Sequence, residues 1–155
     1  MIVLDSNLWV FGLLGQNDRA ATILDDIQHG ETLSVINAYM VQEVLDAFER
    51  TPQLSSAQCD EAQTAFLTRM HQMTGLLEAP SSRDMTQTIL TETRNNTYVR
   101  FIARALDIQP KDVPILVLAS KHSERGPTIL TNDEAFAECA PENHNHPSLT
   151  IEYVA

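Results

Sequence analysis

The chain has 155 residues, and its 21 acidic residues outnumber its 10 lysines and arginines to give a formal net charge of −11. We expect one domain over residues 1–155, because this length suits a single hydrophobic core. So negative a charge excludes a protein that coats nucleic acid by bulk electrostatics. No apolar run approaches the ~20 residues of a membrane span. Asp5 also argues against a signal peptide, so we expect a cytoplasmic protein without membrane contact.

The cysteines and the distribution of charge narrow the expectations further. Cys59 and Cys139 form no CxxC motif, and we expect reduced thiols. Residues 83–125 hold seven basic and five acidic groups, a charge of +2, whereas the rest of the chain sums to −13. This window is compatible with a localised polyanion site, and equally with chance solvation.

The first half of the chain alternates apolar strands with amphipathic helices. In chain order we expect a strand at 2–4, a helix at 8–14, a helix ending at Gly30, a strand at 33–36, helices at 37–50 and 55–73, and a strand at 75–79. Asn17 or Asp18 can cap the second helix, Asn37 can cap the third, and residues 55–58 read as a capping box.

The second half continues this alternation after a polar stretch. Residues 81–95 are rich in Ser and Thr, and we expect only a short helix around Met85–Leu90 there. Helices are expected at 96–106, 113–119 and 133–140, and strands at 128–130 and 149–154, the last at a sheet edge. The helix at 113–119 is apolar almost all round, which predicts burial. Together these elements predict an α/β domain with a mostly parallel sheet.

Three aspartates fall near points where such sheets bind ligands. Asp5 ends the first strand and Asp133 follows the strand at 128–130, so both lie beyond the carboxyl ends of strands. Asp112 begins the buried helix. Asp112 and Asp133 also fit an ordinary structural role as helix N-caps.

Two glutamates on the helix at 37–50 are further candidates. Taking about 100° per residue, Glu43 and Glu49 lie on opposite flanks of the apolar stripe, while Asp46 points away from it. Periodicity therefore excludes Asp46 and does not choose between the two glutamates. A solvated helix edge is the ordinary alternative for Glu43.

Four segments together carry a recognisable pattern. They are Val3-Leu4-Asp5-Ser6-Asn7, Val41-Gln42-Glu43-Val44, Asp112-Val113-Pro114-Ile115-Leu116-Val117-Leu118-Ala119 and Ile129-Leu130-Thr131-Asn132-Asp133-Glu134-Ala135-Phe136. The most specific feature is D-x-x-I-L-x-L-A followed by T-N-D-x-x-F. In order, spacing and flanking residues the pattern resembles the PIN domain, a family of metal-dependent ribonucleases that includes VapC-type toxins. The resemblance covers essentially the full chain.

The resemblance implies a fold and an acidic cluster. The fold is a three-layer α/β/α sandwich with about five mostly parallel strands, in which the strands at 2–4 and 128–130 are neighbours. The acidic cluster is Asp5, Glu43, Asp112 and Asp133, which selects Glu43 over Glu49, with Glu134 as a fifth candidate. Ser6, Asn7 and Thr131 are implied as polar groups that orient the acids. Residues 81–95 match no part of the family pattern.

The residue types of this cluster suggest its chemistry. Converging carboxylates raise one another's pKa, and hard divalent cations relieve the repulsion, so Mg²⁺ or Mn²⁺ is the expected cofactor. Zinc is not expected, because no Cys or His lies nearby. Such metals promote phosphodiester hydrolysis, and the family resemblance implies that the substrate is single-stranded RNA. Arg100, Arg104 and Lys111 are candidates for contacts to RNA phosphates.

Alternatives and partners complete the sequence-based expectations. The rival class is a catalytically inactive PIN-fold binding module. A haloacid-dehalogenase-like phosphatase is excluded, because Asn7 stands where it needs a second acid. His144-Asn145-His146 is read as a surface loop. We expect a homodimer, as in many relatives, and a small basic antitoxin. The candidate dimer surface lies on the helices at 37–50 and 55–73, with Phe48, Phe66 and Met70, for each of which core packing is the alternative.

Overall fold

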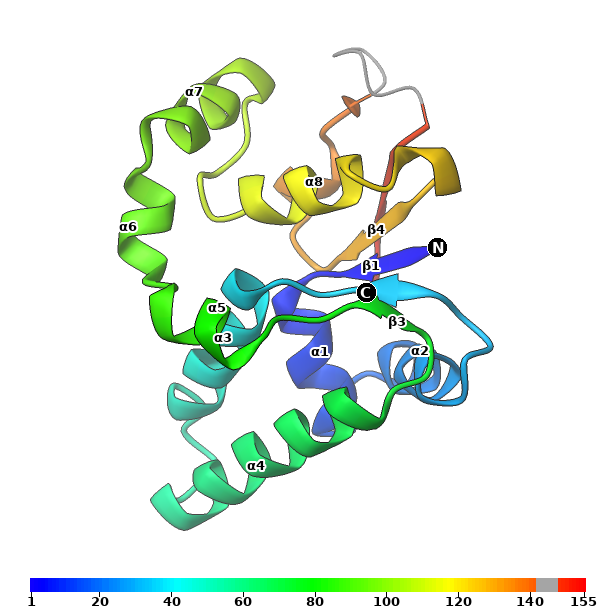
Figure 1. Cartoon of the computed structure of the whole chain (residues 1–155), viewed down its shortest axis with the longest axis vertical. Coiled ribbons are helices and arrows are strands. Elements are labelled where there is room, and N and C mark those ends of the chain that lie inside the picture. The colour runs from blue at the N-terminus through cyan, green and yellow to red at the C-terminus, as the bar shows by residue number, and fades with distance from the viewer. Residues whose placement is uncertain (142–147) are drawn as a thin grey trace.

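The computed structural model describes residues 1–141 and 148–155 (Figure 1). The segment His144–His146 therefore lies outside the described residues. Strands β1 (Ile2–Leu4), β4 (Thr128–Thr131) and β5 (Thr150–Tyr153) form a parallel sheet in the order β1-β4-β5. Strands β2 (Ser34–Val35) and β3 (Leu76–Glu78) form a second parallel pair. The predicted mostly parallel α/β fold is confirmed.

The two groups of strands meet at β1. Ile2 donates its backbone N–H to the carbonyl of Leu33 at 2.9 Å, on the side of β1 opposite to β4. The expected sheet is thus present as a group of three and a group of two strands within the described residues, linked at this point. The prediction that the strands at 2–4 and 128–130 are neighbours is confirmed, and so is the edge position of β5.

Helices cover both faces of the strands and give the expected three layers. Figure 1 shows α8 (Val113–Ser120) on one side and α1 (Ser6–Leu13), α2 (Asp18–His29), α3 (Ala38–Glu49) and α4 (Ser56–Gln72) on the other. The helix α8 is buried over most of its length, as its apolar sequence predicts. No helix in the described part of the chain is both long enough and apolar enough to cross a membrane.

Short polar side chains begin these helices, as the sequence predicts. Asn17 accepts a hydrogen bond from Ala20 N at 2.8 Å, and Asn37 accepts one from Met40 N at 2.9 Å. Ser55 and Gln58 form the expected capping box of α4. These bonds satisfy N–H groups that have no partner inside the helix. The cap on α3 fixes the start of the helix that carries Glu43.

Residues 81–95 fold differently from the prediction of one short helix around Met85–Leu90. They form α5 (Ser82–Gln87) and α6 (Leu90–Asn95), separated by Thr88 and Ile89 in extended conformation. Ser81 begins α5 with a capping box completed by Asp84. The predicted helix is wrong because its span crosses the break, where two β-branched residues favour extended backbone. The helix α7 (Thr97–Leu106) follows and confirms the prediction for 96–106.

The last helix is shorter than expected. A helix over 133–140 is predicted, whereas α9 (Glu134–Ala137) ends at Ala137. Cys139 N donates to Phe136 O at 3.1 Å, three residues back, which is the tight geometry of a helix end. Pro141 also disfavours helical backbone at the residue before it.

The aromatic and methionine side chains of α3 and α4 belong to the core. Phe48 and Phe66 are each 1% exposed and Met70 is 3% exposed in the single chain. The prediction that these three form a dimer surface is therefore wrong, because their side chains pack inside the chain and the alternative of core packing holds. Cys59 is a buried free thiol.

Candidate active site

Two of the predicted acids follow neighbouring strands. Asp5 comes directly after β1 and Asp133 closely follows β4, so the pairing of these parallel strands brings both to the same edge of the sheet. Thr131 lies between them. Its hydroxyl donates to Asp5 Oδ2 at 2.7 Å and accepts from the backbone N–H of Asp133 at 3.0 Å. One threonine thus holds the side chain of one acid and the backbone of the other.

Burial dominates the electrostatics of Asp5. The residue is 6% exposed, and burial raises the pKa of its carboxyl above the ordinary value. The hydrogen bond from Thr131 lowers this pKa and the nearby charge of Glu43 raises it. A carboxylate in this position is stabilised by any cation that enters beside it.

Glu43 is the buried glutamate of α3. It is 9% exposed, whereas Glu49 lies on the exposed end of the helix, so the structure places the glutamate that the family resemblance selects beside Asp5. Ser6 donates to Glu43 Oε2 at 2.6 Å, and Tyr39 donates to Oε1 at 3.1 Å. Arg94 Nη2 donates to the same Oε1 at 2.5 Å.

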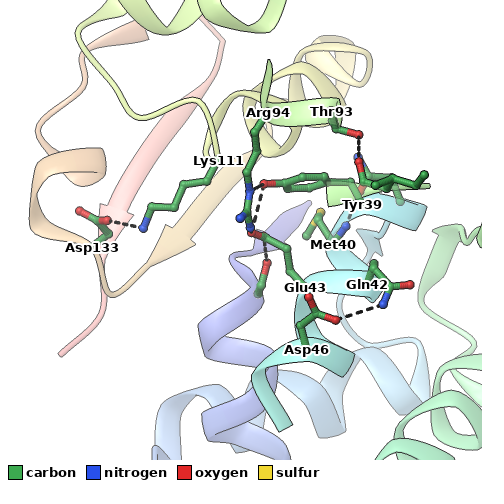
Figure 2. A network of polar contacts seen from close by, with 12 residues as sticks. Tyr39, Met40, Gln42, Glu43, Asp46, Thr93, Arg94, Lys111 and Asp133 are labelled. Atoms are coloured by element: carbon green, nitrogen blue, oxygen red, sulfur yellow. Dashed lines mark hydrogen bonds and ion pairs between the residues drawn. The ribbon is translucent and has the colours of Figure 1, made fainter. Parts of the chain in front are cut away.

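Arg94 reaches the site from α6, far away in sequence. Figure 2 shows its side chain between Tyr39 and Glu43. Its Nε donates to the Tyr39 hydroxyl at 2.8 Å, and the guanidinium lies 5.7 Å from the centroid of that ring. The Glu43 side chain is 11% exposed and that of Arg94 is 32% exposed, so this ion pair is partly shielded from water. Both oxygens of Glu43 therefore have protein donors.

Asp112 is the acid without a partner. It occupies the N-cap position of α8, yet its side chain makes no cap hydrogen bond. The residue is 3% exposed, and among the described residues no group donates to its carboxylate. Burial, and to a lesser degree the charges of Asp5, Asp133 and Glu43, raises its pKa to about 7 although Lys111 opposes the shift. The sequence position of Asp112 allowed a role as a helix N-cap, but its side chain does not cap α8.

Asp133 does act as a helix cap. Its Oδ1 accepts from Phe136 N at 3.2 Å at the start of α9. Its Oδ2 accepts from Lys111 Nζ at 3.0 Å, and Figure 2 shows the lysine side chain turned toward it. Burial raises the pKa of Asp133, but the bonds from Lys111 and from backbone N–H groups outweigh it and hold this pKa below the ordinary value.

Three of the four predicted acids share one pocket. Asp5, Glu43 and Asp112 line a cavity of about 220 Å³, together with Arg50, Arg94 and Lys111. Asp133 does not line it and lies beyond Lys111 at its margin. The pocket thus contains three acidic and three basic side chains among its described lining residues.

The donor set of this pocket suits a hard divalent cation, because carboxylate oxygens are the ligands that Mg²⁺ and Mn²⁺ prefer. In this structure, basic side chains of the protein neutralise the negative charge of two of the acids instead. Within residues 1–141 and 148–155, no three His, Cys, Asp or Glu side chains converge closely enough to hold one ion as they stand. Arg94 and Lys111 bond the oxygens that Glu43 and Asp133 would offer. The donor chemistry therefore suits a divalent cation, whereas the arrangement of the described residues does not yet surround one.

Several predicted site residues lie elsewhere. Arg100 and Arg104 are exposed on α7 and do not line the acidic pocket, whereas Lys111 does. Glu134 is exposed in the first turn of α9 and is not among the pocket's lining residues. Asn7 lines the pocket, but the only side-chain hydrogen bond it forms among the described residues joins its Nδ2 to Asn132 at 3.3 Å, so its side chain holds none of the four acids.

Sequence reasoning missed three residues of the site. Tyr39 and Arg50 lie four residues before and seven after Glu43, which is helical spacing on one face, so periodicity could have found both. Arg94 offers no such signal, because it joins Glu43 across 51 positions of sequence. Only the folded chain brings α6 to α3.

Comparisons with known proteins support the fold. No protein-family model matches the chain, and no curated protein matches it by sequence. Among solved structures, the chain is similar to one chain of the crystal structure of VapBC2 from Rickettsia felis bound to a DNA fragment from their promoter. The TM-score is 0.53 and the identity 17%, and the match covers 100% of both chains. At this identity the likeness shows a shared fold over the whole chain.

Replacing Arg94 with methionine should destabilise the chain in the absence of divalent cations. The substitution keeps most of the side-chain volume but leaves Glu43 without its cationic partner. We expect the free energy of unfolding in EDTA to fall by about 1–3 kcal/mol, less than for a fully buried pair because Arg94 is partly exposed. Urea titration followed by circular dichroism measures it.

The matched control for this variant is Arg83→Met, on the exposed surface of α5. It should change the free energy of unfolding by less than about 0.5 kcal/mol. Added Mn²⁺ should restore most of the stability lost in Arg94→Met, since a divalent cation can take the place of the guanidinium. Equal losses in the two variants would show that the ion pair contributes nothing specific.

Proposed function

We propose that this protein is a ribonuclease that depends on Mg²⁺ or Mn²⁺ and hydrolyses phosphodiester bonds of single-stranded RNA. One observation carries the proposal: the buried carboxylate of Asp112, without a donor among the described residues, shares a pocket with Asp5 and Glu43 at the carboxyl edge of the sheet. No described protein group donates a hydrogen bond to this carboxylate, and its partial removal from water costs free energy. A cation offsets that cost.

Asp5, Glu43 and Asp112 would hold the cation, and Asp133 would join them when Lys111 releases it. A divalent cation there supplies a Lewis acid for a phosphodiester and an activated water. Thr131 and Ser6 keep Asp5 and Glu43 oriented through the bonds described above. The basic side chains of the pocket are then free to contact phosphate oxygens, for which Lys111 remains a candidate.

We further propose that the protein is the toxin of a toxin–antitoxin pair in the cytoplasm. The fold it shares with a chain of VapBC2 and the resemblance of its motifs to VapC-type toxins support this role. A net charge of −11 suits a small basic antitoxin. An arginine of such a partner could form a bidentate pair with the acids of the pocket in place of the metal. A homodimer remains part of the proposal, through a surface other than Phe48, Phe66 and Met70.

A second candidate is an inactive binding module with the same fold. The ion pairs of Glu43 with Arg94 and of Asp133 with Lys111 favour it, since they neutralise two of the four acids without any metal. The unpartnered Asp112 argues against it. The two candidates differ most sharply in their response to metal.

A divalent cation should therefore stabilise the protein and support cleavage. At ten times its Kd, Mn²⁺ should add about 1.4 kcal/mol of stability, a rise in Tm of about 3–6 °C. Thermal unfolding with and without Mn²⁺ measures this, and gel analysis of an end-labelled single-stranded RNA measures cleavage with Mg²⁺, Mn²⁺ or EDTA. No change in Tm at millimolar metal, together with no cleavage, would favour the binding module. Cleavage that persists in EDTA would overturn the metal-dependent reaction.

A further inference from the structure

The helix α7 displays two aromatic side chains to solvent. Tyr98 is 61% exposed and Phe101 is 67% exposed, the two most exposed large hydrophobic side chains in the described part of the chain. On the opposite face of the helix, Val99 and Ala103 are buried. Folding thus leaves two rings on one helix outside the core, three residues apart.

Two arginines accompany these rings. Arg100 and Arg104 are exposed, one turn apart, and form no ion pair or side-chain hydrogen bond with any described residue. With Thr97 and Phe101 they line a shallow hollow along the helix. The sequence of α7, TYVRFIARAL, contains no acid. In a chain with a net charge of −11, this helix is a locally cationic and aromatic surface.

A cavity borders one side of this helix. This cavity of about 470 Å³ lies between α8 and the segments that follow β2 and β3. Tyr98 lines it from α7 and Tyr39 lines it from α3. The Tyr39 hydroxyl in turn donates to Glu43 in the acidic pocket. Tyr39 thus borders this cavity and bonds a residue of the acidic pocket, while the cavity and the pocket have no described lining residue in common.

We propose that α7 is a binding surface for single-stranded nucleic acid, on which bases stack against Tyr98 and Phe101 and phosphates contact Arg100 and Arg104. The combination of rings and unpaired cations is what a single strand requires, because each base presents a π-face and each linkage a negative charge. This inference deepens the proposed function: under it, the strand is RNA, which α7 binds outside the acidic pocket.

The charges on α7 favour a nucleic acid over a second copy of the chain. In a two-fold contact centred on α7, the same patch meets itself, so Arg100 and Arg104 of both copies would be brought together. The helix has no acid to compensate them. A polyanion, in contrast, pairs with all of these cations at once.

Binding is tested with a fluorescein-labelled ten-nucleotide oligouridylate in EDTA, so that cleavage plays no part. Phe101→Ala should weaken the affinity about tenfold, as measured by anisotropy, since this is within the range found for removing one stacked base contact. Phe101→Trp should retain the affinity, because it keeps an aromatic face. Tyr153→Ala, which removes a 43% exposed aromatic ring on β5, is the matched control and should leave the affinity unchanged.

The arginines have a different signature in the same assay. Arg100→Gln and Arg104→Gln should each lower the slope of log affinity against log salt concentration by about 0.7, the value for one phosphate contact on a single strand. Phe101→Ala should lower the affinity without changing that slope. Circular dichroism checks that every variant is folded.

Two results would overturn the inference. One is that Phe101→Ala and the two arginine variants bind the oligonucleotide as the parent does. The other is that Phe101→Ala changes the mass measured by light scattering, because α7 would then be a protein interface. Failure here leaves the proposed function standing if the parent still cleaves RNA with Mn²⁺. If the parent protein binds the oligonucleotide through α7 but does not cleave RNA, the proposed ribonuclease activity is refuted and the inference about α7 stands.

Discussion

Replacing Asp5 with asparagine should abolish metal-dependent RNA hydrolysis while the fold stays intact. Loss of a partner that only orients a metal ligand costs 10- to 100-fold, so loss of a proposed ligand should reduce the rate by more than about 100-fold. Asparagine has nearly the same volume, and its Oδ1 can still accept the hydrogen bond from Thr131. Because burial raises the pKa of Asp5, removing its charge should not reduce the stability of the metal-free protein.

The rate of cleavage of an end-labelled RNA in Mn²⁺, together with Tm in EDTA, measures both parts of this expectation. Asp60→Asn is the matched control, since it changes an exposed aspartate of α4 and should retain full activity. The rise in Tm caused by Mn²⁺ should also be lost in Asp5→Asn. Undiminished cleavage by Asp5→Asn would show that the reaction does not use this pocket.

The metal-free protein should lose stability as the pH rises from about 4 to about 7. The folded state holds the pKa of Asp112 at about 7, above its ordinary value of 3.8, so folded molecules bind more protons than unfolded ones between these values. The contribution of this carboxyl to the free energy of unfolding is then fully present below about pH 4 and is lost as the pH rises through 7. At 1.36 kcal/mol per pKa unit, the loss from Asp112 is at most about 4 kcal/mol.

Asp112→Asn isolates this contribution, because asparagine does not titrate. In EDTA, its free energy of unfolding at pH 8 should exceed that of the parent, and the difference should shrink toward pH 4. Urea titrations at a series of pH values measure it, with Asp60→Asn again as the control. Mn²⁺ should reverse the order by stabilising only the parent at pH 8. Parallel pH profiles in EDTA would show that Asp112 is not held protonated by the fold.

Features encoded by neighbouring residues could be predicted from the sequence, and pairings across long separations could not. Asn37 and Ser55 begin helices because the bonds they form are local. The position of Asp5 follows from the end of a short apolar strand. The choice of Glu43 needed the family resemblance, since helical periodicity left Glu49 equally open.

The environment of the acids depended on contacts that no local pattern encodes. Arg94 lies in a segment without a family counterpart, and its bond to Glu43 exists only because α6 packs near α3. Lys111 bonds Asp133 across 22 positions. The break between α5 and α6 also escaped prediction, although the Ser81–Asp84 capping box was readable. The acidic residues of the pocket could therefore be predicted from the sequence more accurately than the basic residues that pair with them.

Arg94 joins two parts of the molecule. Its guanidinium anchors α6 to the acidic pocket, and α6 is joined to α7 through the single residue Asn96, which caps α7. A ligand that displaces Arg94 from Glu43 would remove one contact of this segment, while the buried Leu90 still ties α6 to the core. If cation binding at the pocket altered strand binding on α7 through this segment, the free energy of that effect would be the same in both directions.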